Sequence, residues 1–308
     1  MATPKSYGIC YMGTKNALAE RIVALLPSAS HLIDVFAGGC AVTHCAMKSG
    51  KWQHVHANDI NEMIVGAFLR AINGEFIGER RWVSHEEFNR VRDTDAYAAI
   101  CFSFGGVLYH YAYNPQREQL LRAFHFAIYY GDASFFLDMT GIDLTPVLNI
   151  ADLRERAIAA SRIVREMKKN DEDKILTKLP PHNIQNHCRL NRISADFSEE
   201  QRKRLTIGSV DFAEVEIPSN SVVYCDPPYR GTGGYLKAKR FNHERFYDWA
   251  LRQTVPVFVS EYAMPEDFVE VAAWQKVCSM SRNTAPKATT EKLFVPRWQA
   301  NDLGFRTE

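Results

Sequence analysis

The stretch Ser221-Val-Val-Tyr-Cys-Asp-Pro-Pro-Tyr-Arg-Gly-Thr-Gly-Gly-Tyr235 organises the chain. Its first five residues, 221–225, are rich in β-branched and aromatic types and predict a short buried strand. Pro227 and Pro228 follow almost at once, and neither has an N–H group to donate to a sheet. We therefore expect the chain to leave the sheet here in a stiff turn, at the carboxyl edge where open α/β sheets bind ligands.

Residues 226–229 suit a reaction on the amino group of a nucleobase. The nitrogen of such a group is a poor nucleophile because its lone pair is delocalised into the ring, and two acceptors aimed at its hydrogens would localise the lone pair again. Asp226 can supply one acceptor, and the Pro227 carbonyl, fixed by the Pro228 ring, can supply the other. Tyr229 offers a flat face for an unstacked base, which is worth about 1–3 kcal/mol. The alternative is a strand that ends in a proline turn without a chemical role.

Composition limits the kind of protein. The chain has 308 residues, of which 46% are hydrophobic, and this is enough for one large domain or a core domain with an insert. Because the net charge is only +1, a nucleic-acid surface must come from local clustering of basic residues. The seven cysteines are scattered without a Cys-x-x-Cys pair, so we expect no metal site and no disulfide framework. We also expect no secretory signal, no membrane span and a cytoplasmic location.

The first residues predict a glycine-containing loop that leads into an amphipathic helix closed by Pro27. Tyr11 and Lys15 flank Gly13 in this loop. A lysine near a helix start is unfavourable to the helix dipole, and this favours a lysine that binds a carboxylate or phosphate. A solvated surface lysine is an equal alternative.

Residues 32–42 predict a strand that runs through Gly38 and Gly39 into a helix. Glycines at such a turn let the backbone approach a ligand closely, although the pattern is not the Gly-x-Gly-x-x-Gly phosphate cradle. A tight turn without a ligand is the alternative.

Two further strands are expected to end in acidic residues. Asp59 follows the strand at 55–58 and is placed either to accept both hydroxyls of a ribose or to cap the next helix. Asp211 and Phe212 end the strand predicted at 205–212, where they could accept from an adenine amino group and pack on its ring. A plain turn at the strand end is the alternative.

Residues 75–178 show mostly helical periodicity and predict a helical insert. Its aromatic segment, 102–114, includes Tyr109 and Tyr111, for which core packing is the favoured interpretation and contact with bases the alternative. Arg117 and Arg122 could meet phosphates. After the proline turn, a basic stretch where a DNA backbone should pass contains Arg230, Lys237, Lys239, Arg240 and Arg245. The remaining pattern predicts helices at 241–250 and 265–273 and strands at 255–262 and 291–295.

Taken in order, these motifs resemble the Dam-type DNA adenine-N6 methyltransferases, especially stand-alone phage and prophage members. The resemblance covers 1–75 and 204–308, whereas the insert matches poorly. Cys40 departs from the pattern because the family usually has a third glycine or a small residue there. The matching motifs are Tyr-x-Gly-x-Lys at 11–15, Asp-x-Phe-Ala-Gly-Gly at 34–39, Asn-Asp-Ile-Asn at 58–61, Asp-Phe at 211–212, Tyr-x-Asp-Pro-Pro-Tyr at 224–229 and Ser-Glu-Tyr at 260–262.

The resemblance implies an α/β fold with a Rossmann-like, S-adenosylmethionine-dependent methyltransferase sheet. The catalytic domain would comprise 1–74 and 179–308, and the insert 75–178 would recognise the target. S-adenosylmethionine would be the methyl donor and S-adenosylhomocysteine the product. Its implied contacts are Tyr11 and Lys15 at the methionine end, Asp59 at the ribose, and Asp211 with Phe212 at the adenine; Asp34, Phe36, Gly38, Gly39 and Asp226 complete the candidate cofactor site.

The implied reaction is N6 methylation of an adenine flipped out of double-stranded DNA, without a covalent intermediate or a metal. N4-cytosine methylation, RNA adenine methylation and a catalytically silent DNA-binding protein on the same scaffold stay open as alternatives. We expect a monomer or weak dimer in a bacterial or phage-infected cell, either as an orphan enzyme or linked to restriction-modification.

Overall fold

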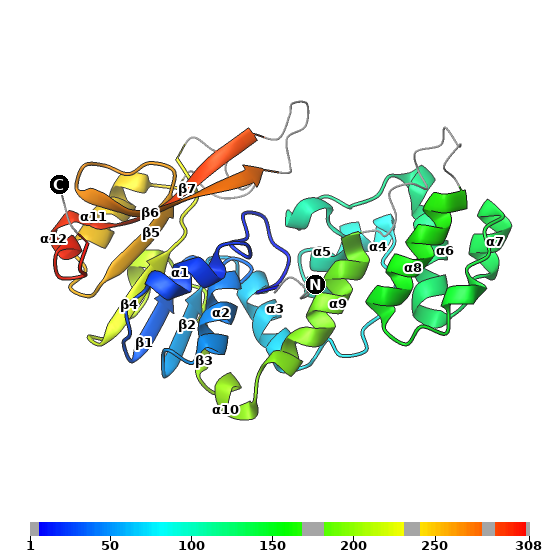
Figure 1. Ribbon diagram of the computed structural model, residues 1–308, viewed down its shortest axis with the longest axis horizontal. Coiled ribbons are helices and arrows are strands. Elements are labelled where there is room, and N and C mark those ends of the chain that lie inside the picture. The colour runs from blue at the N-terminus through cyan, green and yellow to red at the C-terminus, as the bar shows by residue number, and fades with distance from the viewer. Residues whose placement is uncertain (1–5, 168–181, 231–240, 279–286, 306–308) are drawn as a thin grey trace. The chain divides into compact units, whose positions relative to one another are not determined.

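The computed structural model of the protein describes residues 6–167, 182–230, 241–278 and 287–305. It contains a seven-stranded sheet in the order β3-β2-β1-β4-β5-β7-β6 (Figure 1). The strands are β1 (His31–Asp34), β2 (His54–Asn58), β3 (Leu205–Gly208), β4 (Ser221–Cys225), β5 (Val257–Glu261), β6 (Phe268–Cys278) and β7 (Lys287–Pro296).

The central strand of this sheet is β4, and all five of its residues are buried. It pairs in parallel with β1 on one side and with β5 on the other. Strands β2 and β3 continue the parallel part, whereas β7 is antiparallel to both β5 and β6. Parallel neighbours need crossover connections, and the helix α2 (Ala41–Ser49) supplies the one between β1 and β2. This is the predicted Rossmann-like α/β sheet.

Contacts divide the chain into two compact units, which we call the sheet unit and the helical unit. The sheet unit comprises residues 1–8, 14–66 and 197–308, and the helical unit comprises 9–13 and 67–196. These boundaries differ from those expected from the sequence, because residues 9–13 and the stretch up to 196 cluster with the helical unit.

The helices of the sheet unit are short. In Figure 1, α1 and α2 lie in front of the sheet. Helix α3 is continuous across the boundary between the two units, which falls after Gly66. The sheet-unit helices besides α2 are α1 (Ala19–Leu25), α3 (Glu62–Ile72), α10 (Glu199–Arg202), the 3-10 turn η5 (Phe212–Glu214), α11 (His243–Leu251) and α12 (Arg297–Ala300).

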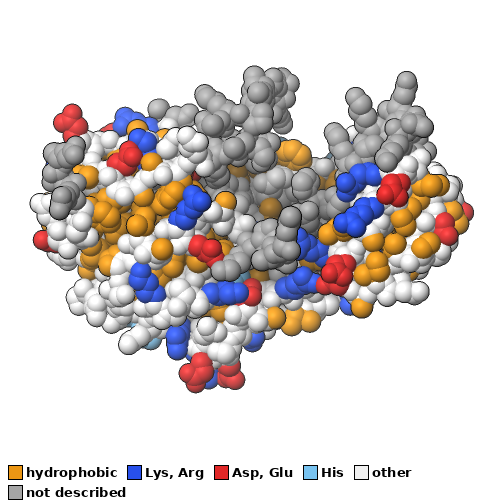
Figure 2. Space-filling view, viewed as in Figure 1, with side chains coloured by type: hydrophobic (Ala, Val, Ile, Leu, Met, Phe, Trp, Pro, Cys, Tyr) orange, Lys and Arg blue, Asp and Glu red, His pale blue; other side chains and the backbone are white. Residues whose placement is uncertain are grey.

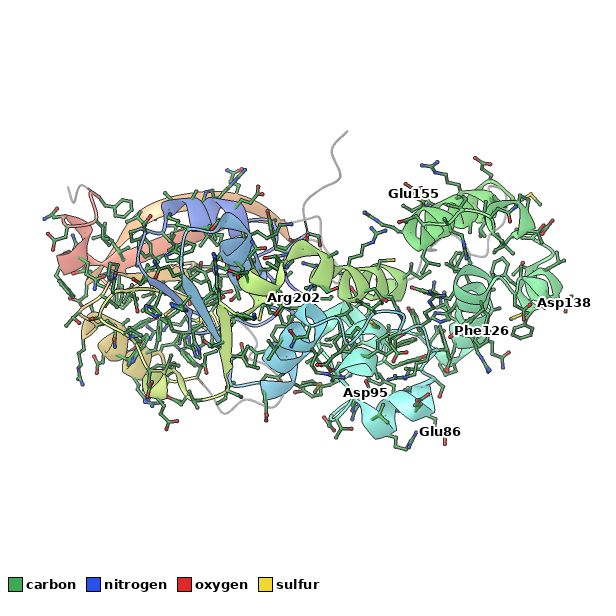
Figure 3. The ribbon with its side chains drawn as sticks, turned by 90° about the horizontal axis from the view of Figure 1, so that it is seen from below. Glu86, Asp95, Phe126, Asp138, Glu155 and Arg202 are labelled. Carbon is green, nitrogen blue, oxygen red and sulfur yellow. The ribbon has the colours of Figure 1, made fainter. Side chains whose placement is uncertain are left out.

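The helical unit has its own apolar core, built largely from α6 and the helices that pack on it. Figure 3 shows Phe126 on α6 and Asp138 on α7. The elements are α4 (His85–Val91), α5 (Ala96–Phe102), η1 (Phe104–Gly106), α6 (Pro115–Tyr130), α7 (Ser134–Thr140), η2 (Thr145–Val147), α8 (Leu153–Met167), α9 (His182–Arg192) and η4 (Ile193–Asp196).

One expected element is wrong. The helix predicted at 265–273 is instead the start of β6, which pairs with β7 along its length. Phe268, Val271 and Ala272 have the spacing of a helical face, and this produced the error. Long-range pairing with β7 overrides that local pattern, and a register shift between Glu270 and Ala272 interrupts the two-residue alternation that marks a strand.

The surface of the described part of the chain is mixed in charge. Figure 2 shows Lys and Arg side chains interspersed with Asp and Glu side chains on the visible face. None of the helices in the described ranges is both long enough and apolar enough to span a membrane.

Two histidines lie buried in the core of the helical unit. The His125 ring packs 4.4 Å from the Tyr129 ring and 5.6 Å from the His187 ring, between centroids. Nε2 of His125 lies 2.7 Å from the Arg80 carbonyl oxygen, to which it can only donate. Burial lowers the pKa of His125 to about 4 and that of His187 well below its usual range. Both imidazoles are therefore neutral in the folded protein at pH 7.

Acid should destabilise the helical unit through these histidines. Because the pKa of His125 is about 4 when folded and near 6.5 when unfolded, the unfolded chain binds more protons between these values. Stability is then lost as the pH falls through this window, by about 2 kcal/mol from pH 7 to pH 5 for His125 alone. Urea unfolding at both pH values measures this difference, and His125→Gln should reduce it. An unchanged pH dependence in the variant would contradict the assignment.

Candidate active site

The Asp226–Tyr229 turn lies at the carboxyl edge of the parallel sheet, directly after β4. Parallel pairing sets Tyr224 beside both Asp34 of β1 and Phe258 of β5. The ends of three neighbouring strands therefore converge on the turn. Pro227 is buried, and the Pro228 carbonyl accepts a hydrogen bond of 2.9 Å from His243.

Two carboxylates share one buried ammonium group beside this turn. The Lys15 Nζ lies 2.7 Å from Oδ2 of Asp226 and 3.2 Å from Oε1 of Glu291. The side chains of Lys15 and Glu291 are 7% and 2% exposed, and that of Asp226 is 18% exposed. Burial acts to lower the pKa of Lys15, but the two carboxylates more than offset it and raise the pKa above its usual value. The cluster has two acidic side chains for one basic side chain.

The second oxygen of Asp226 differs from the first. Oδ1 is buried and has no hydrogen-bond partner among the described residues. Burial raises the pKa of Asp226, Lys15 opposes that shift and Glu291 adds to it, while a hydrogen bond from the Tyr229 hydroxyl lowers the pKa of Asp226. A buried carboxylate oxygen without a donor is costly unless a ligand supplies one. The arrangement fixes one oxygen on Lys15 and leaves the other able to accept a hydrogen from a bound amine.

Tyr229 is held by three neighbours. Its hydroxyl donates to Oε1 of Glu291. The Lys15 ammonium lies 4.9 Å from the centre of its ring, and the Tyr262 ring meets it edge-on at 4.7 Å between centroids. These contacts fix the orientation of the aromatic ring that we expected to stack on a base.

The backbone after the turn is anchored by Glu261 at the end of β5. Its buried carboxylate accepts from the backbone N–H groups of Arg230 at 3.1 Å and Tyr262 at 2.7 Å. Burial raises the pKa of Glu261 to about 7. Glu261 therefore connects the ends of β4 and β5.

The turn between β1 and α2 has the close backbone approach expected of a ligand loop. Thr43 donates to Oδ2 of the buried Asp34 at 2.6 Å, while Oδ1 has no partner among the described residues. Burial raises the pKa of Asp34 to about 7. Cys40 has a φ of 56°, in the left-handed region that favours glycine. The departure at Cys40 from the pattern of the resembled family thus falls on a strained backbone position.

Asp59 is joined to this turn. Its Oδ2 accepts from the Gly38 N–H at 2.8 Å, and its Oδ1 accepts from the Asn61 N–H at 2.9 Å. Each carboxylate oxygen has a further lone pair for a ligand hydroxyl. Phe36, in the same turn, packs in the aromatic cluster formed with Phe212 and Phe246.

Asp211 has a partner that the sequence did not reveal. Arg245 donates to both of its oxygens, at 2.7 and 2.9 Å, and lowers the pKa of Asp211. The Arg245 guanidinium also lies 4.7 Å from the centre of the buried Phe212 ring. Strand β3 ends at Gly208, so Asp211 caps η5 instead of ending the strand. Both expected adenine contacts therefore adjoin one arginine.

The remaining candidates are placed as follows. Tyr11 belongs to the helical unit, where its backbone packs against Gly106. Arg230 is exposed, with Nη1 3.5 Å from a Glu244 oxygen. Lys237, Lys239 and Arg240 lie outside the described residues.

The aromatic and basic candidates of the helical unit take part mainly in packing. The Tyr111 hydroxyl donates to the Val83 carbonyl, and its ring stacks on His85. The Tyr109 carbonyl accepts from Arg92 at 2.6 Å. Arg117 follows the helix cap of α6, and the exposed Arg122 lies over the Phe126 ring at 5.5 Å. Tyr111 is half-buried among these contacts.

Sequence reasoning gave Glu291 and Glu261 no role, and it placed Arg245 among the basic residues expected near DNA without its pairing with Asp211. A signal for Glu291 was present, since Glu291, Leu293 and Val295 alternate along β7 and all three are buried. A charged residue on the buried face of a strand needs a partner or a function. No group of side chains in the described part of the chain could hold a metal ion.

One of the three comparisons with known proteins identifies a family. A family model described as D12 class N6 adenine-specific DNA methyltransferase matches residues 11–253. A search of curated protein sequences gave no match. Two solved structures of the rRNA methyltransferase aviRa from Streptomyces viridochromogenes are similar at 13% identity and a TM-score of 0.33, covering 96% and 93% of this chain and 90% and 86% of that chain. A structural similarity this low supports no conclusion about the substrate.

Gly8 should be essential to the loop between β1 and α2. It has a φ of +65°, and a Cβ there would lie 2.1 Å from the Gly39 carbonyl oxygen. Gly50 has a φ of +68° and nothing within 4 Å of an added Cβ, so it is a matched control that measures only the cost of the left-handed backbone. We expect Gly50→Ala to cost about 1 kcal/mol and Gly8→Ala about 3 kcal/mol or more, measured by urea unfolding. Equal losses would mean that the contact with Gly39 is unimportant.

Proposed function

The chain belongs to the D12 class N6 adenine-specific DNA methyltransferase family, and on that premise we propose that its Asp226–Tyr229 turn methylates a flipped-out adenine in double-stranded DNA. Membership in the family makes the chain an enzyme and implies S-adenosylmethionine as the methyl donor. The observation that carries the residue assignment is the buried, unpartnered Oδ1 of Asp226, whose other oxygen is fixed by Lys15.

The turn acts by orienting the amino group. Asp226 Oδ1 accepts one hydrogen of the adenine N6, and the Pro227 carbonyl accepts the other, so that the lone pair points at the methyl carbon. After transfer the nitrogen carries an extra proton, which the Asp226 carboxylate is placed to take. The raised pKa of Asp226 supports this role because it makes the carboxylate a better base. Positioning and electrostatics supply the rate enhancement.

The residues around β1 and β2 fit the methyl donor. When bound, S-adenosylmethionine supplies an electrophilic methyl group on a positively charged sulfur. Asp34 offers the buried Oδ1 without a partner to the ammonium of the methionine end. Asp59 keeps lone pairs for the ribose hydroxyls, and the Gly38–Gly39 turn lets a ligand approach the backbone.

Contacts at the adenine end and at Tyr11 are also part of this proposal. Asp211 would accept a hydrogen bond from the cofactor adenine only if Arg245 shares or releases the Asp211 carboxylate. Phe212 would pack against the same ring. Tyr11 and Lys15 would meet the methionine end, with Lys15 also holding Asp226.

The duplex would be held by basic side chains and selected by the helical unit. Arg230, with the loop that follows it, would contact the phosphates, and Tyr109, Arg117 and Arg122 would be available on the helical unit. Within the family we place the protein with the Dam-type members of phage or prophage origin, acting in the cytoplasm as a monomer or weak dimer.

Asp226→Ala should abolish methyl transfer and leave a folded protein. Folding is retained because Lys15 keeps Glu291 as a partner. Transfer of a radiolabelled methyl group to DNA measures activity, and analysis of the nucleosides separates N6-methyladenine from N4-methylcytosine. Turnover by the variant at the wild-type rate would refute the role of Asp226, and methylcytosine from the wild type would favour the cytosine alternative.

Tyr229→Ala should reduce the population of the flipped base far more than it reduces the affinity for the cofactor. Stacking on an aromatic ring contributes about 1–3 kcal/mol, so we expect a loss of about 5- to 100-fold in the population of the flipped base. Fluorescence of 2-aminopurine at the target position reports flipping, and calorimetry reports cofactor affinity. Lost cofactor affinity with normal flipping would contradict this role.

A further inference from the structure

We infer that Glu291 is a positioning residue for methyl transfer, acting through Lys15 and Tyr229 on the Asp226 turn. The inference rests on the proposed function and adds to it a residue outside the matched range 11–253. Glu291 comes from β7, in the antiparallel part of the sheet, whereas Asp226 follows the parallel strand β4.

A single oxygen of Glu291 connects the two partners. Oε1 accepts from the Tyr229 hydroxyl and lies 3.2 Å from the Lys15 ammonium. That ammonium in turn lies 2.7 Å from Asp226 Oδ2 and 4.9 Å from the centre of the Tyr229 ring. One carboxylate therefore contacts both the tyrosine that we propose for base stacking and the lysine that holds Asp226.

The burial of Glu291 argues against a purely structural role for its carboxylate. Glu291 is 1% exposed, and a buried carboxylate costs several kcal/mol of desolvation that an apolar residue on the same face of β7 would avoid. Leu293 and Val295 occupy the equivalent buried positions with apolar side chains. A charge retained on this face is accounted for by its effect on the turn.

The charge of Glu291 has a definite effect on Asp226. Because Lys15 is divided between two carboxylates, it neutralises neither of them fully. Removing the Glu291 charge would leave Lys15 paired with Asp226 alone, which would lower the pKa of Asp226 and make it a weaker base. Glu291 therefore keeps Asp226 basic enough to take the amine proton.

The first test is Glu291→Gln, which keeps the size of the side chain and an acceptor for Tyr229 but removes the charge. We expect the single-turnover rate of methyl transfer to fall by about 10- to 100-fold. The affinity for S-adenosylmethionine, measured by calorimetry, should change less than about threefold. Glu270→Gln is the matched control, because it removes a charge from the neighbouring strand where Glu270 only pairs with Lys292 at 2.7 Å. It should leave the rate unchanged.

The pH profile separates positioning from a general loss of structure. Glu291 and burial raise the pKa of Asp226, so Glu291→Gln should move the acid limb of the single-turnover rate to lower pH. A disturbed fold would lower the rate at all pH values without moving the limb. The charged and titratable groups around Asp226 are Lys15 before α1, Asp34 on β1, Tyr224 on β4, Tyr229 in the turn, Glu261 on β5 and Glu291 on β7.

A double-mutant cycle tests the route through Tyr229. Tyr229→Phe removes the hydroxyl that donates to Glu291, and Glu291→Leu removes the acceptor, so the effects of these two changes should not add in the double variant. A wild-type rate and acid limb in Glu291→Gln, or fully additive effects, would overturn the inference while leaving the proposed function intact. A wild-type protein that methylates no DNA would instead overturn the proposed function, and the cycle measured on thermal unfolding would still report the Glu291–Tyr229 coupling.

Discussion

The sharing of one lysine between two buried carboxylates is the constraint on which the active-site geometry depends. Lys15 is divided between Asp226 and Glu291, and in the proposed function the resulting excess of acidic groups favours an amine and a cationic donor. An apolar residue in place of either acid would relieve the desolvation cost but also remove the chemistry. The local cost in stability comes with a buried carboxylate oxygen that has no hydrogen-bond partner in the described part of the chain.

The sheet makes this arrangement possible because it changes direction next to the turn. Parallel strands β1, β4 and β5 deliver Asp34, Asp226 and Glu261 to one edge. The antiparallel β7 then pairs with β5, and it adds Glu291 to the same region from the other end of the chain. A wholly parallel sheet would present only strand ends there, whereas the reversed strand contributes a residue from its interior.

Local backbone chemistry predicts the turns and strands around this site, and long-range pairing determines the contacts that the sequence did not reveal. The diproline turn after β4 and the glycine turn after β1 follow from backbone chemistry, so the sheet and the positions of Asp226, Asp34 and Asp59 were predictable from sequence. The ion pairs were not predictable, because Lys15 and Glu291 are far apart in the chain, as are Asp211 and Arg245. The helix expected at 265–273 failed for the same reason, since only pairing with β7 makes that segment a strand.

The passage of the chain between units near its start has a practical consequence for engineering. Residues 9–13 cluster with the helical unit, where the Met12 N–H donates to the Gly106 carbonyl, yet Gly8 and Lys15 on either side cluster with the sheet unit. The helical unit is therefore not formed by the continuous segment 67–196 alone. A chimera that exchanges only those residues for the segment of another protein would separate residues 9–13 from the residues with which they cluster, including Gly106.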